Sequence, residues 1–191
     1  MRISDEIFVT MIEVLQAIRR KVKVDEPPSG RLNRASVAVA LKDAGKLSLL
    51  LIKRADRADD PWSGQIALPG GRAREGDLTL RDTAIRETLE EVGIDLRKDA
   101  SFVGYTTPFM THTGSMEVFP AVFLLEKDVD VRPNDEVSSF RWIELEKLMA
   151  EQSKSKLRVN LQGETMETSA LIVDDYSIWG LTHRIITFLL S

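Results

Sequence analysis

Cysteine is absent from the 191 residues of this chain. Its absence excludes disulfide bonds, thiolate zinc sites, iron–sulfur clusters and cysteine nucleophiles. A chain without disulfides suits an intracellular protein, and we expect a cytoplasmic location.

The chain also lacks an excess of basic residues and a long hydrophobic run. Its 26 Lys and Arg are outnumbered by 30 Asp and Glu, which gives a formal net charge of −4. Non-specific binding to nucleic acid needs many basic side chains that neutralise phosphates, so we expect no nucleic-acid partner. No stretch approaches the roughly 18 consecutive apolar residues of a membrane span, and the N-terminus carries acids within its apolar part. We therefore expect no membrane partner and no secretory signal.

What the chain does contain is an ordinary balance of residues, 43% hydrophobic and 29% charged, which suits one domain over residues 1–191. Residues 1–30 are interpreted as an N-terminal helix and connector, and residues 35–190 as the core. Between residues 5 and 20, apolar residues recur at helical spacing, namely Ile7, Phe8, Met11, Ile12, Leu15 and Ile18. This segment is predicted to be an amphipathic helix packed on its own domain or on a partner subunit, and a homodimer is one expectation from it.

Apolar runs bounded by turn residues predict strands through much of the remaining chain. Residues 35–42 and 47–54 are predicted to form a hairpin closed by residues 43–46. The other expected elements are strands at 101–109, 116–126 and 138–145, a short helix at 145–152, a hairpin over 157–175 turning at Gln162 and Gly163, and a helix from Ile178 to Leu189. Strands and helices alternate without a regular βαβ repeat, which favours an α+β domain with a mixed sheet over a doubly wound sheet.

A glycine-containing turn, "LPGGRAREGD" at residues 68–77, precedes an acidic helical stretch. Two adjacent glycines after a proline fit neither a helix nor a strand interior, so they predict a backbone that approaches something closely. The composition of the next residues predicts a helix from Leu78 to Val92. Asp77 is placed to cap its N-terminus, and Gly93 is placed to end it in a left-handed conformation.

Three glutamates share one face of this predicted helix. Glu87, Glu90 and Glu91 fall within about a 100° arc, because residues three and four apart are neighbours on a helix surface. Such close like charges repel one another, and only Arg86 is placed to pair with Glu90. A divalent cation would relieve the repulsion, since Mg²⁺ takes oxygen ligands and is often held by a few carboxylates together with substrate phosphates. An isolated acidic face is usually solvated, but the glycine turn directly upstream favours phosphate chemistry.

The stretch from Gly71 to Ile94 resembles the Nudix box, whose usual pattern is G, five residues, E, seven residues and then R-E-U-x-E-E-x-G-U, where U is a bulky apolar residue. The matching residues are Arg86, Glu87, Glu90, Glu91, Gly93 and Ile94. Asp77 replaces the first glutamate, the gap from there to Arg86 is eight residues, and Thr88 holds an apolar position. The resemblance implies a Nudix fold, in which a mixed β-sheet is sandwiched between helices.

The departures from the pattern are similar to a branch of the family that acts on coenzyme A and related compounds. Residues 49–71 resemble that branch's apolar strand, basic residue, spacer, glycine and "FPGG", with Leu68 in the Phe position. Residues 59–63, "DDPWS", stand where the branch usually has basic and histidine residues. Residues 107–123 and 176–186 resemble the middle strands and the closing helix of these enzymes.

What the resemblance implies is a hydrolase that uses Mg²⁺ or Mn²⁺ to cleave a diphosphate linkage in a small nucleotide substrate. The implied metal ligands are Glu87, Glu90, Glu91 and Gly71, and Arg86 completes the catalytic group by orienting a box glutamate. The residues expected to contact the substrate are Arg54, Arg57, Gly70 and Phe109.

Several assignments stay open on the sequence alone. Asp77 is a helix cap or a catalytic acid, Glu136 is a general base or a loop acid, and His112 reaches a pocket or is merely exposed. The remaining candidates are aromatic or imidazole side chains. Trp62 is interpreted either as stacking on the substrate or as filling the core, and Trp142, Trp179 and His183 are interpreted as core or helix-surface residues.

The sequence leaves three candidate functions. The first is hydrolysis of coenzyme A or an acyl derivative to 3′,5′-ADP and phosphopantetheine. The second is hydrolysis of another nucleoside diphosphate compound, with ADP-ribose foremost. The third is a non-catalytic nucleotide-binding module, against which the three mutually repelling acids argue.

Overall fold

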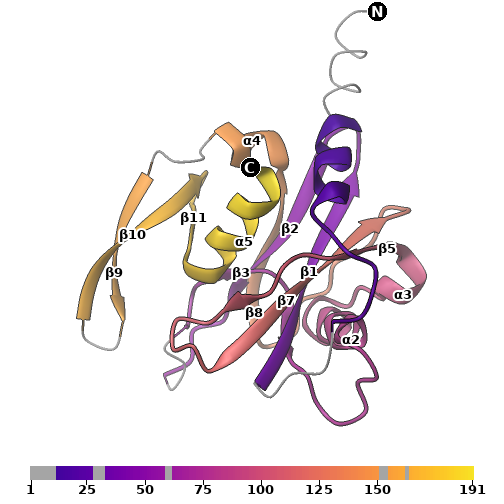
Figure 1. The fold of residues 1–191 in the computed structure, drawn as a ribbon. Coiled ribbons are helices and arrows are strands. Elements are labelled where there is room, and N and C mark those ends of the chain that lie inside the picture. The colour runs from indigo at the N-terminus through magenta and orange to yellow at the C-terminus, as the bar shows by residue number, and fades with distance from the viewer. Residues whose placement is uncertain (1–11, 28–32, 59–61, 151–154, 162–163) are drawn as a thin grey trace, which may run out of the picture.

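The computed structural model describes residues 12–27, 33–58, 62–150, 155–161 and 164–191 (Figure 1). Residues 12–20 form a helix, and its Ile18 is 2% exposed within the hydrophobic core. The predicted N-terminal helix is thus confirmed from residue 12 onward, and it packs on its own domain. Ile7, Phe8 and Met11 lie outside the described residues.

A mixed sheet forms the centre of the molecule. Its eight strands are β1 (Asn33–Asp43), β2 (Leu47–Arg54), β3 (Ile66–Ala67), β4 (Gly70–Arg72), β5 (Ala100–Tyr105), β6 (Phe109–Met110), β7 (Met116–Leu125) and β8 (Val137–Glu144). β1 runs parallel to β7 and antiparallel to β2. Asp43 pairs with Leu47, which confirms the predicted hairpin between β1 and β2.

The strands β1 and β2 diverge, and the chain between β2 and the acidic helix fills the gap. Leu41–Asp43 pair with Leu47–Leu49, whereas residues 35–37 of β1 pair with β4 and residues 52–53 of β2 pair with β3. Between β3 and β4, the Pro69 carbonyl accepts a hydrogen bond from the Ala38 N–H at 2.7 Å. The glycine turn is therefore fixed on the sheet at the point where the two strands separate.

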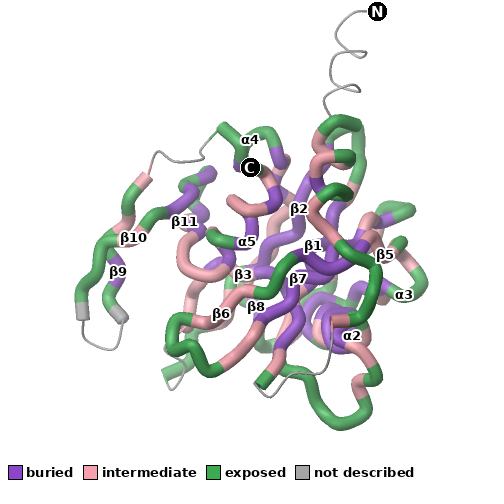
Figure 2. Tube along the Cα trace, viewed as in Figure 1, coloured by how far each residue is buried: buried purple, intermediate pink, exposed green. Residues whose placement is uncertain are grey.

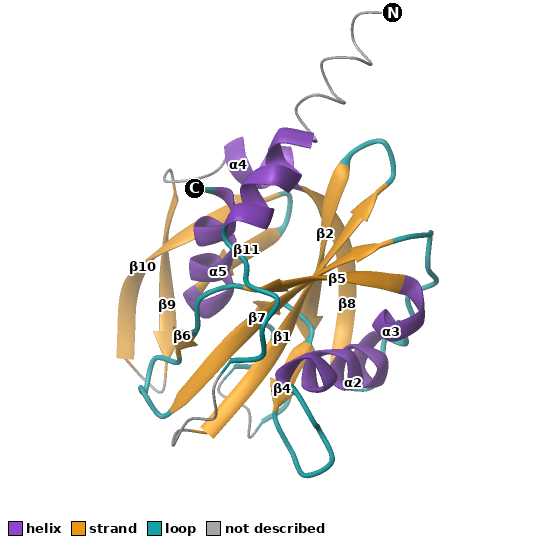
Figure 3. Cartoon of the chain, turned by 45° about the vertical axis from the view of Figure 1, so that its right-hand side comes forward, coloured by secondary structure: helices purple, strands orange, loops and turns teal. Residues whose placement is uncertain are grey.

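Helices cover both faces of this sheet. α2 (Leu80–Val92) and α3 (Leu96–Asp99) lie on one face, while α4 (Leu145–Ala150), α5 (Gly180–Leu190) and residues 12–20 lie on the other. Along β2, Leu49 and Leu51 join the cluster on the α5 side, whereas Leu50 and Ile52 join the cluster on the α2 side. Figure 2 shows the resulting band of buried residues along the central strands. The run of buried residues in β2 follows from this double cover, and the predicted sandwich is confirmed (Figure 3).

A smaller sheet of three antiparallel strands follows α4. It contains β9 (Ser155–Leu161), β10 (Glu164–Val173) and β11 (Tyr176–Trp179) and lies beside α5 (Figure 1). The predicted hairpin is confirmed, although Gln162 and Gly163 lie outside the described residues.

The predicted start of the last helix at Ile178 is wrong. Ile178 pairs with Leu171 in the small sheet, and the helix begins only at Gly180, whose φ is 64°. Tyr176 and Ile178 are buried while Ser177 and Trp179 are half-buried, which is the alternation of a strand. The apolar spacing suited a helix, but pairing with β10 decided the conformation.

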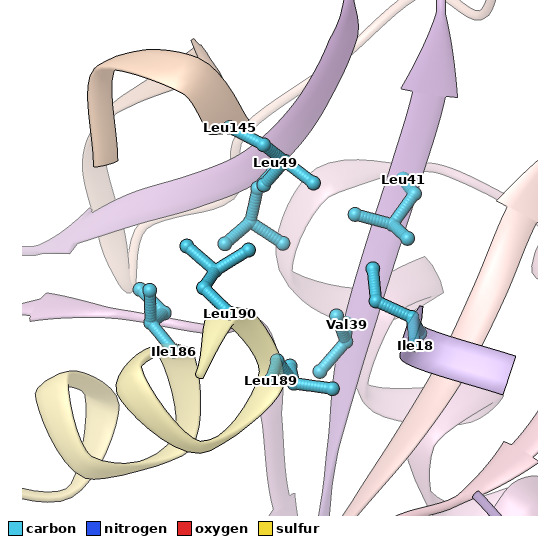
Figure 4. A pocket seen from close by; sticks show the side chains of 8 residues that line it. All are labelled: Ile18, Val39, Leu41, Leu49, Leu145, Ile186, Leu189 and Leu190. Atoms are coloured by element: carbon cyan, nitrogen blue, oxygen red, sulfur yellow. The ribbon is translucent and has the colours of Figure 1, made fainter. Parts of the chain in front are cut away.

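An apolar cavity lies beneath the C-terminal helix (Figure 4). Its volume is about 10 Å³, and its lining side chains are Ile18, Val39, Leu41, Leu49, Leu145, Ile186, Leu189 and Leu190. A space of this size barely reaches that of a water molecule and offers no polar partner, so it is a packing gap rather than a ligand site. Within the described part of the chain, no helix is long and apolar enough to cross a bilayer.

Candidate functional site

The acidic helix α2 begins two residues later than the sequence predicts. Thr79 is the N-cap, and its side chain accepts a hydrogen bond from the Asp82 N–H at 3.0 Å. Gly93 ends the helix with a φ of 72°, and its N–H donates to the Leu89 carbonyl at 3.1 Å, as predicted. The assignment of Asp77 as the cap is therefore wrong, because Thr79 is the residue whose side chain meets the free backbone N–H groups.

Asp77 instead ties the preceding loop to the middle of the helix. Its carboxylate accepts hydrogen bonds from Arg86 Nε at 3.0 Å and Nη2 at 2.9 Å, and from the Thr83 hydroxyl at 3.0 Å. The Asp77 side chain is 7% exposed. The hydrogen bonds from Arg86 lower the pKa of this carboxyl to about 2, against the opposing effect of burial. Asp77 is thus ionised at neutral pH and holds Arg86 in place.

Arg86 lies at the centre of the acidic face. It donates to Glu87 Oε1 at 2.6 Å and to Glu90 Oε2 at 3.2 Å, and its Nη2 also donates to the Arg72 carbonyl at 3.0 Å. The pKa of the guanidinium is raised, and the largest cause is its hydrogen bond to Asp77. One arginine therefore links the glycine turn to two glutamates of the helix.

The two glycines of the turn approach the box carboxylates closely. The Gly70 N–H donates to Glu91 Oε2 at 2.9 Å, and a Cβ at Gly70 would lie 2.4 Å from the Ser36 carbonyl oxygen. A Cβ at Gly71 would lie 2.6 Å from the Glu87 carboxylate. The close backbone approach predicted from the sequence is therefore present: Gly71 lies against the Glu87 carboxylate of the helix, and Gly70 lies against β1 while its N–H reaches Glu91.

Glu91 is the most electrostatically perturbed acid of the box. It is 4% exposed, and burial raises its pKa to about 7 although the Gly70 N–H opposes this shift. The charge of Glu87 raises this pKa further, Arg54 lowers it and Glu136 raises it. Arg54 from β2 and Glu136 from the loop before β8 are therefore brought within electrostatic range of Glu91.

Backbone contacts hold that loop against the helix and against the end of β2. The Asn134 N–H donates to the Glu91 carbonyl at 2.9 Å, and the Ala55 N–H donates to the Glu136 carbonyl at 2.8 Å. Arg57 pairs with Glu136 at 3.9 Å, and both side chains are about half exposed. The structure thus places Arg54, Arg57 and Glu136 around one end of α2.

The donor set suits a hard divalent cation such as Mg²⁺ or Mn²⁺, because it consists of carboxylate oxygens and includes a buried acid whose ionisation a cation would favour. In the arrangement described, however, Glu90 pairs with Arg74 at 2.7 Å and Glu87 pairs with Arg86. Among the described residues, no group of three or more acidic or histidine side chains stands in position to hold an ion. Binding a cation would therefore require Glu87 and Glu90 to exchange their arginine contacts for it.

Other candidate residues lie apart from the box. Phe109 packs edge-to-face on Phe188 of α5 at 5.8 Å, on the sheet face opposite α2. His112 is exposed in the turn after β6. The Trp142 ring is covered by Lys42, whose Nζ lies 4.7 Å from the ring centroid. His183 is half-buried on α5, and burial lowers its pKa. The structure does not bring these side chains together with the carboxylates.

The sequence interpretation missed a groove on the α5 side of the sheet. It lies between the end of β2 and the small sheet, and Trp179, interpreted from the sequence as a core or helix-surface residue, is part of its wall. The signal that could have revealed this was the alternation in "YSIW", which places Ser177 and Trp179 on the less buried side of a strand.

Comparison with known proteins agrees with the box. The family profile of the NUDIX domain matches residues 32–161. An uncharacterized protein of Schizosaccharomyces pombe is 34% identical over 179 residues, covering 80% of this chain and 53% of its own, so the chain spans about half the length of that relative. An uncharacterized Nudix hydrolase of Yersinia pestis, NudL, is 31% identical over 157 residues, covering 82% of this chain and 77% of its own.

Solved structures share the fold. A Caenorhabditis elegans Ap4A hydrolase in a binary complex is 22% identical with a TM-score of 0.52, covering 62% of this chain and 85% of its own. A MutT/nudix family protein of Enterococcus faecalis is 19% identical with a TM-score of 0.51, covering 92% of this chain and 66% of its own. The box geometry, the family profile and these relatives lead to one conclusion: the chain belongs to the Nudix domain family.

Proposed function

We propose that this protein is a divalent-cation-dependent hydrolase that cleaves the diphosphate linkage of a nucleoside diphosphate derivative. The observation that carries the proposal is the buried Glu91, which accepts a hydrogen bond from Gly70 N–H at 2.9 Å on the same helix that bears Glu87 and Glu90. A buried carboxyl with a raised pKa costs stability when it ionises, and such groups concentrate at functional sites.

In the reaction, the oxygen of a water molecule bonds to one phosphorus, and the bridging oxygen leaves with the other phosphate. A bound divalent cation would neutralise the diphosphate and lower the pKa of the attacking water. The side chains that would hold it are Glu87, Glu90 and Glu91, with the Gly71 backbone beside Glu87. Arg86 bridges Glu87 and Glu90 and would release their oxygens to the cation, while Asp77 keeps Arg86 in place beside them. Arg54 places a positive charge near Glu91.

For the substrate, we propose coenzyme A or an acyl derivative, which would yield 3′,5′-ADP and phosphopantetheine. The support is the resemblance of residues 49–71 and of the Asp77-containing box to the coenzyme A branch. The short stretch at residues 59–63 departs from that branch. ADP-ribose is the second candidate, because the box acts on the diphosphate shared by both compounds.

The test is product analysis by chromatography after incubation with Mg²⁺ and either coenzyme A or ADP-ribose. Wild-type protein should release 3′,5′-ADP from coenzyme A, and Glu91→Gln should lose this activity while keeping its circular dichroism spectrum. Glu146→Gln on α4 is the matched control, since it makes the same chemical change at an exposed site. If only ADP-ribose is cleaved, with AMP as a product, then ADP-ribose replaces coenzyme A as the proposed substrate. If neither compound nor any other nucleoside diphosphate derivative gives a product, the result favours a non-catalytic binder.

A further inference from the structure

A polar groove separates the end of β2 from the small sheet. Its volume is about 400 Å³, within the usual range of small-molecule sites. β2, β3 and β8 form one side through Lys53, Gln65 and Ser139, and β9 and β11 form the other through Asn160 and Trp179. We call it the β11 groove.

The β11 groove lies within reach of the box. Lys53 lines the groove while the next residue, Arg54, acts electrostatically on Glu91, because successive side chains of a strand point to opposite faces. Ile66 also lines the groove, and Gly70, four residues later, donates to Glu91. Four residues span at most about 14 Å, so the groove and the box are close in space although they lie on opposite faces of the sheet. A substrate whose diphosphate lies at the box would reach the groove by crossing the sheet where β1 and β2 diverge.

The lining chemistry suits a nucleoside better than an aliphatic chain. Trp179 offers a half-buried indole to the groove, and amides and hydroxyls surround it. Tyr176 beneath is 2% exposed, with its hydroxyl 3.2 Å from the Ser139 hydroxyl and its ring 4.7 Å from the Arg141 guanidinium. This wall is therefore held rigidly from behind, and an aromatic face with amide groups is what a stacked base requires.

The charge of the groove indicates a second anionic group on the ligand. Among the described residues that line the groove, Lys53 is the single cationic one. The described lining contains one carboxylate, Asp175, which pairs with Arg141. No carboxylate of the described residues pairs with Lys53. Arg54 lies on the other face of β2, beside the box, and would already serve the diphosphate. An ammonium group on the groove side is thus available for a phosphate beyond the diphosphate.

We propose that the β11 groove binds the nucleoside end of the substrate, with the base stacked on Trp179, and that Lys53 selects nucleotides whose ribose carries an additional phosphate. The inference rests on the proposed diphosphate hydrolysis and names its substrate class. Coenzyme A belongs to this class and ADP-ribose does not.

The first test is calorimetric binding of adenosine 3′,5′-bisphosphate and of 5′-AMP without divalent cations. Wild-type protein should bind the bisphosphate about tenfold more tightly, as one added charge-assisted contact allows. Lys53→Met should remove this difference and leave 5′-AMP binding unchanged. Trp179→Ala should weaken both ligands about tenfold, and Trp179→Phe should restore most of the loss, because it keeps a ring for stacking.

The control is Lys46→Met, which removes an exposed lysine just before the other end of β2, where it pairs with Glu144. It should bind both nucleotides as the wild type does. Equal binding of the two nucleotides by wild-type protein, or an unchanged preference in Lys53→Met, would overturn the proposal.

Steady-state kinetics separate this proposal from the proposed function. If both hold, Lys53→Met raises KM for coenzyme A about tenfold with kcat unchanged, since the contact is equally present before and during the reaction. If the groove variants turn over coenzyme A with unchanged KM, the proposed nucleoside binding in the groove is refuted, and the proposed hydrolase activity is supported. Absence of any diphosphate turnover together with the expected binding pattern would refute the hydrolase instead, and would support the groove as a nucleotide site.

Discussion

Replacing each glycine of the turn by alanine tests how the turn and the helix act together. Gly71 does not have a positive φ, so alanine fits its backbone, but the new Cβ would lie 2.6 Å from the Glu87 carboxylate. An ordinary carbon contact needs about 3.5 Å, so the carboxylate must move by about 1 Å. Because Glu87 lies at the end of a flexible side chain, Gly71→Ala should cost less than about 1 kcal/mol of stability.

The activity should respond far more than the stability. A displacement of about 1 Å in a catalytic arrangement can cost about 100-fold in rate, and disturbing a ligand's support typically weakens metal affinity about 10- to 100-fold. We expect Gly71→Ala to lower kcat by about 10- to 100-fold and to raise the Mg²⁺ concentration needed for half-maximal activity. Urea unfolding and a Mg²⁺ titration of the hydrolysis rate measure the two effects.

Gly70→Ala is the informative counterpart. Gly70 has a φ of 153°, and its Cβ would meet the Ser36 carbonyl oxygen at 2.4 Å and the Val37 Cα at 2.5 Å, which are backbone atoms that cannot rotate away. Strain and overpacking together should cost about 2 kcal/mol or more. Gly45→Ala, with a φ of 82° and open space around it, is the control for backbone strain alone and should keep full activity. Wild-type kinetics in Gly71→Ala, or wild-type stability in Gly70→Ala, would refute the close approach on which the site depends.

Three further predictions concern the same helix. In protein free of divalent cations, the pKa of Glu91 in the folded state, about 7, exceeds its ordinary value of 4.5, so the free energy of unfolding should fall by about 3 kcal/mol as pH rises between these values. Glu91→Gln should abolish this fall in urea titrations. The pKa of Asp77 is shifted in the opposite direction, from an ordinary value of 3.8 to about 2, so its ionised form should stabilise the fold by about 2 kcal/mol above pH 4, and this contribution is lost as pH falls through 2. Asp77→Asn should therefore lower the free energy of unfolding at pH 7 and make it less sensitive to acid. Thr79→Ala should cost about 1 kcal/mol by thermal unfolding, and an unchanged melting temperature would contradict its role as the N-cap.

The sequence by itself determined the features that depend on local periodicity. The helical period places Glu87, Glu90 and Glu91 on one face, and Gly93 ends that helix because a left-handed residue is needed there. The alternation of strands and helices was enough for an α+β class, and the box was enough for the family. These are properties of short stretches, which neighbouring residues largely fix.

Only the tertiary structure decided what lies beside what. Thr79 displaces Asp77 as the cap because Arg86 draws the Asp77 carboxylate to the middle of the helix, and Ile178 is a strand residue because β10 supplies its partner. The β11 groove likewise exists only because the C-terminal strands return to the end of β2. Such contacts join residues far apart in the chain, and their energies depend on packing and burial that no local pattern records.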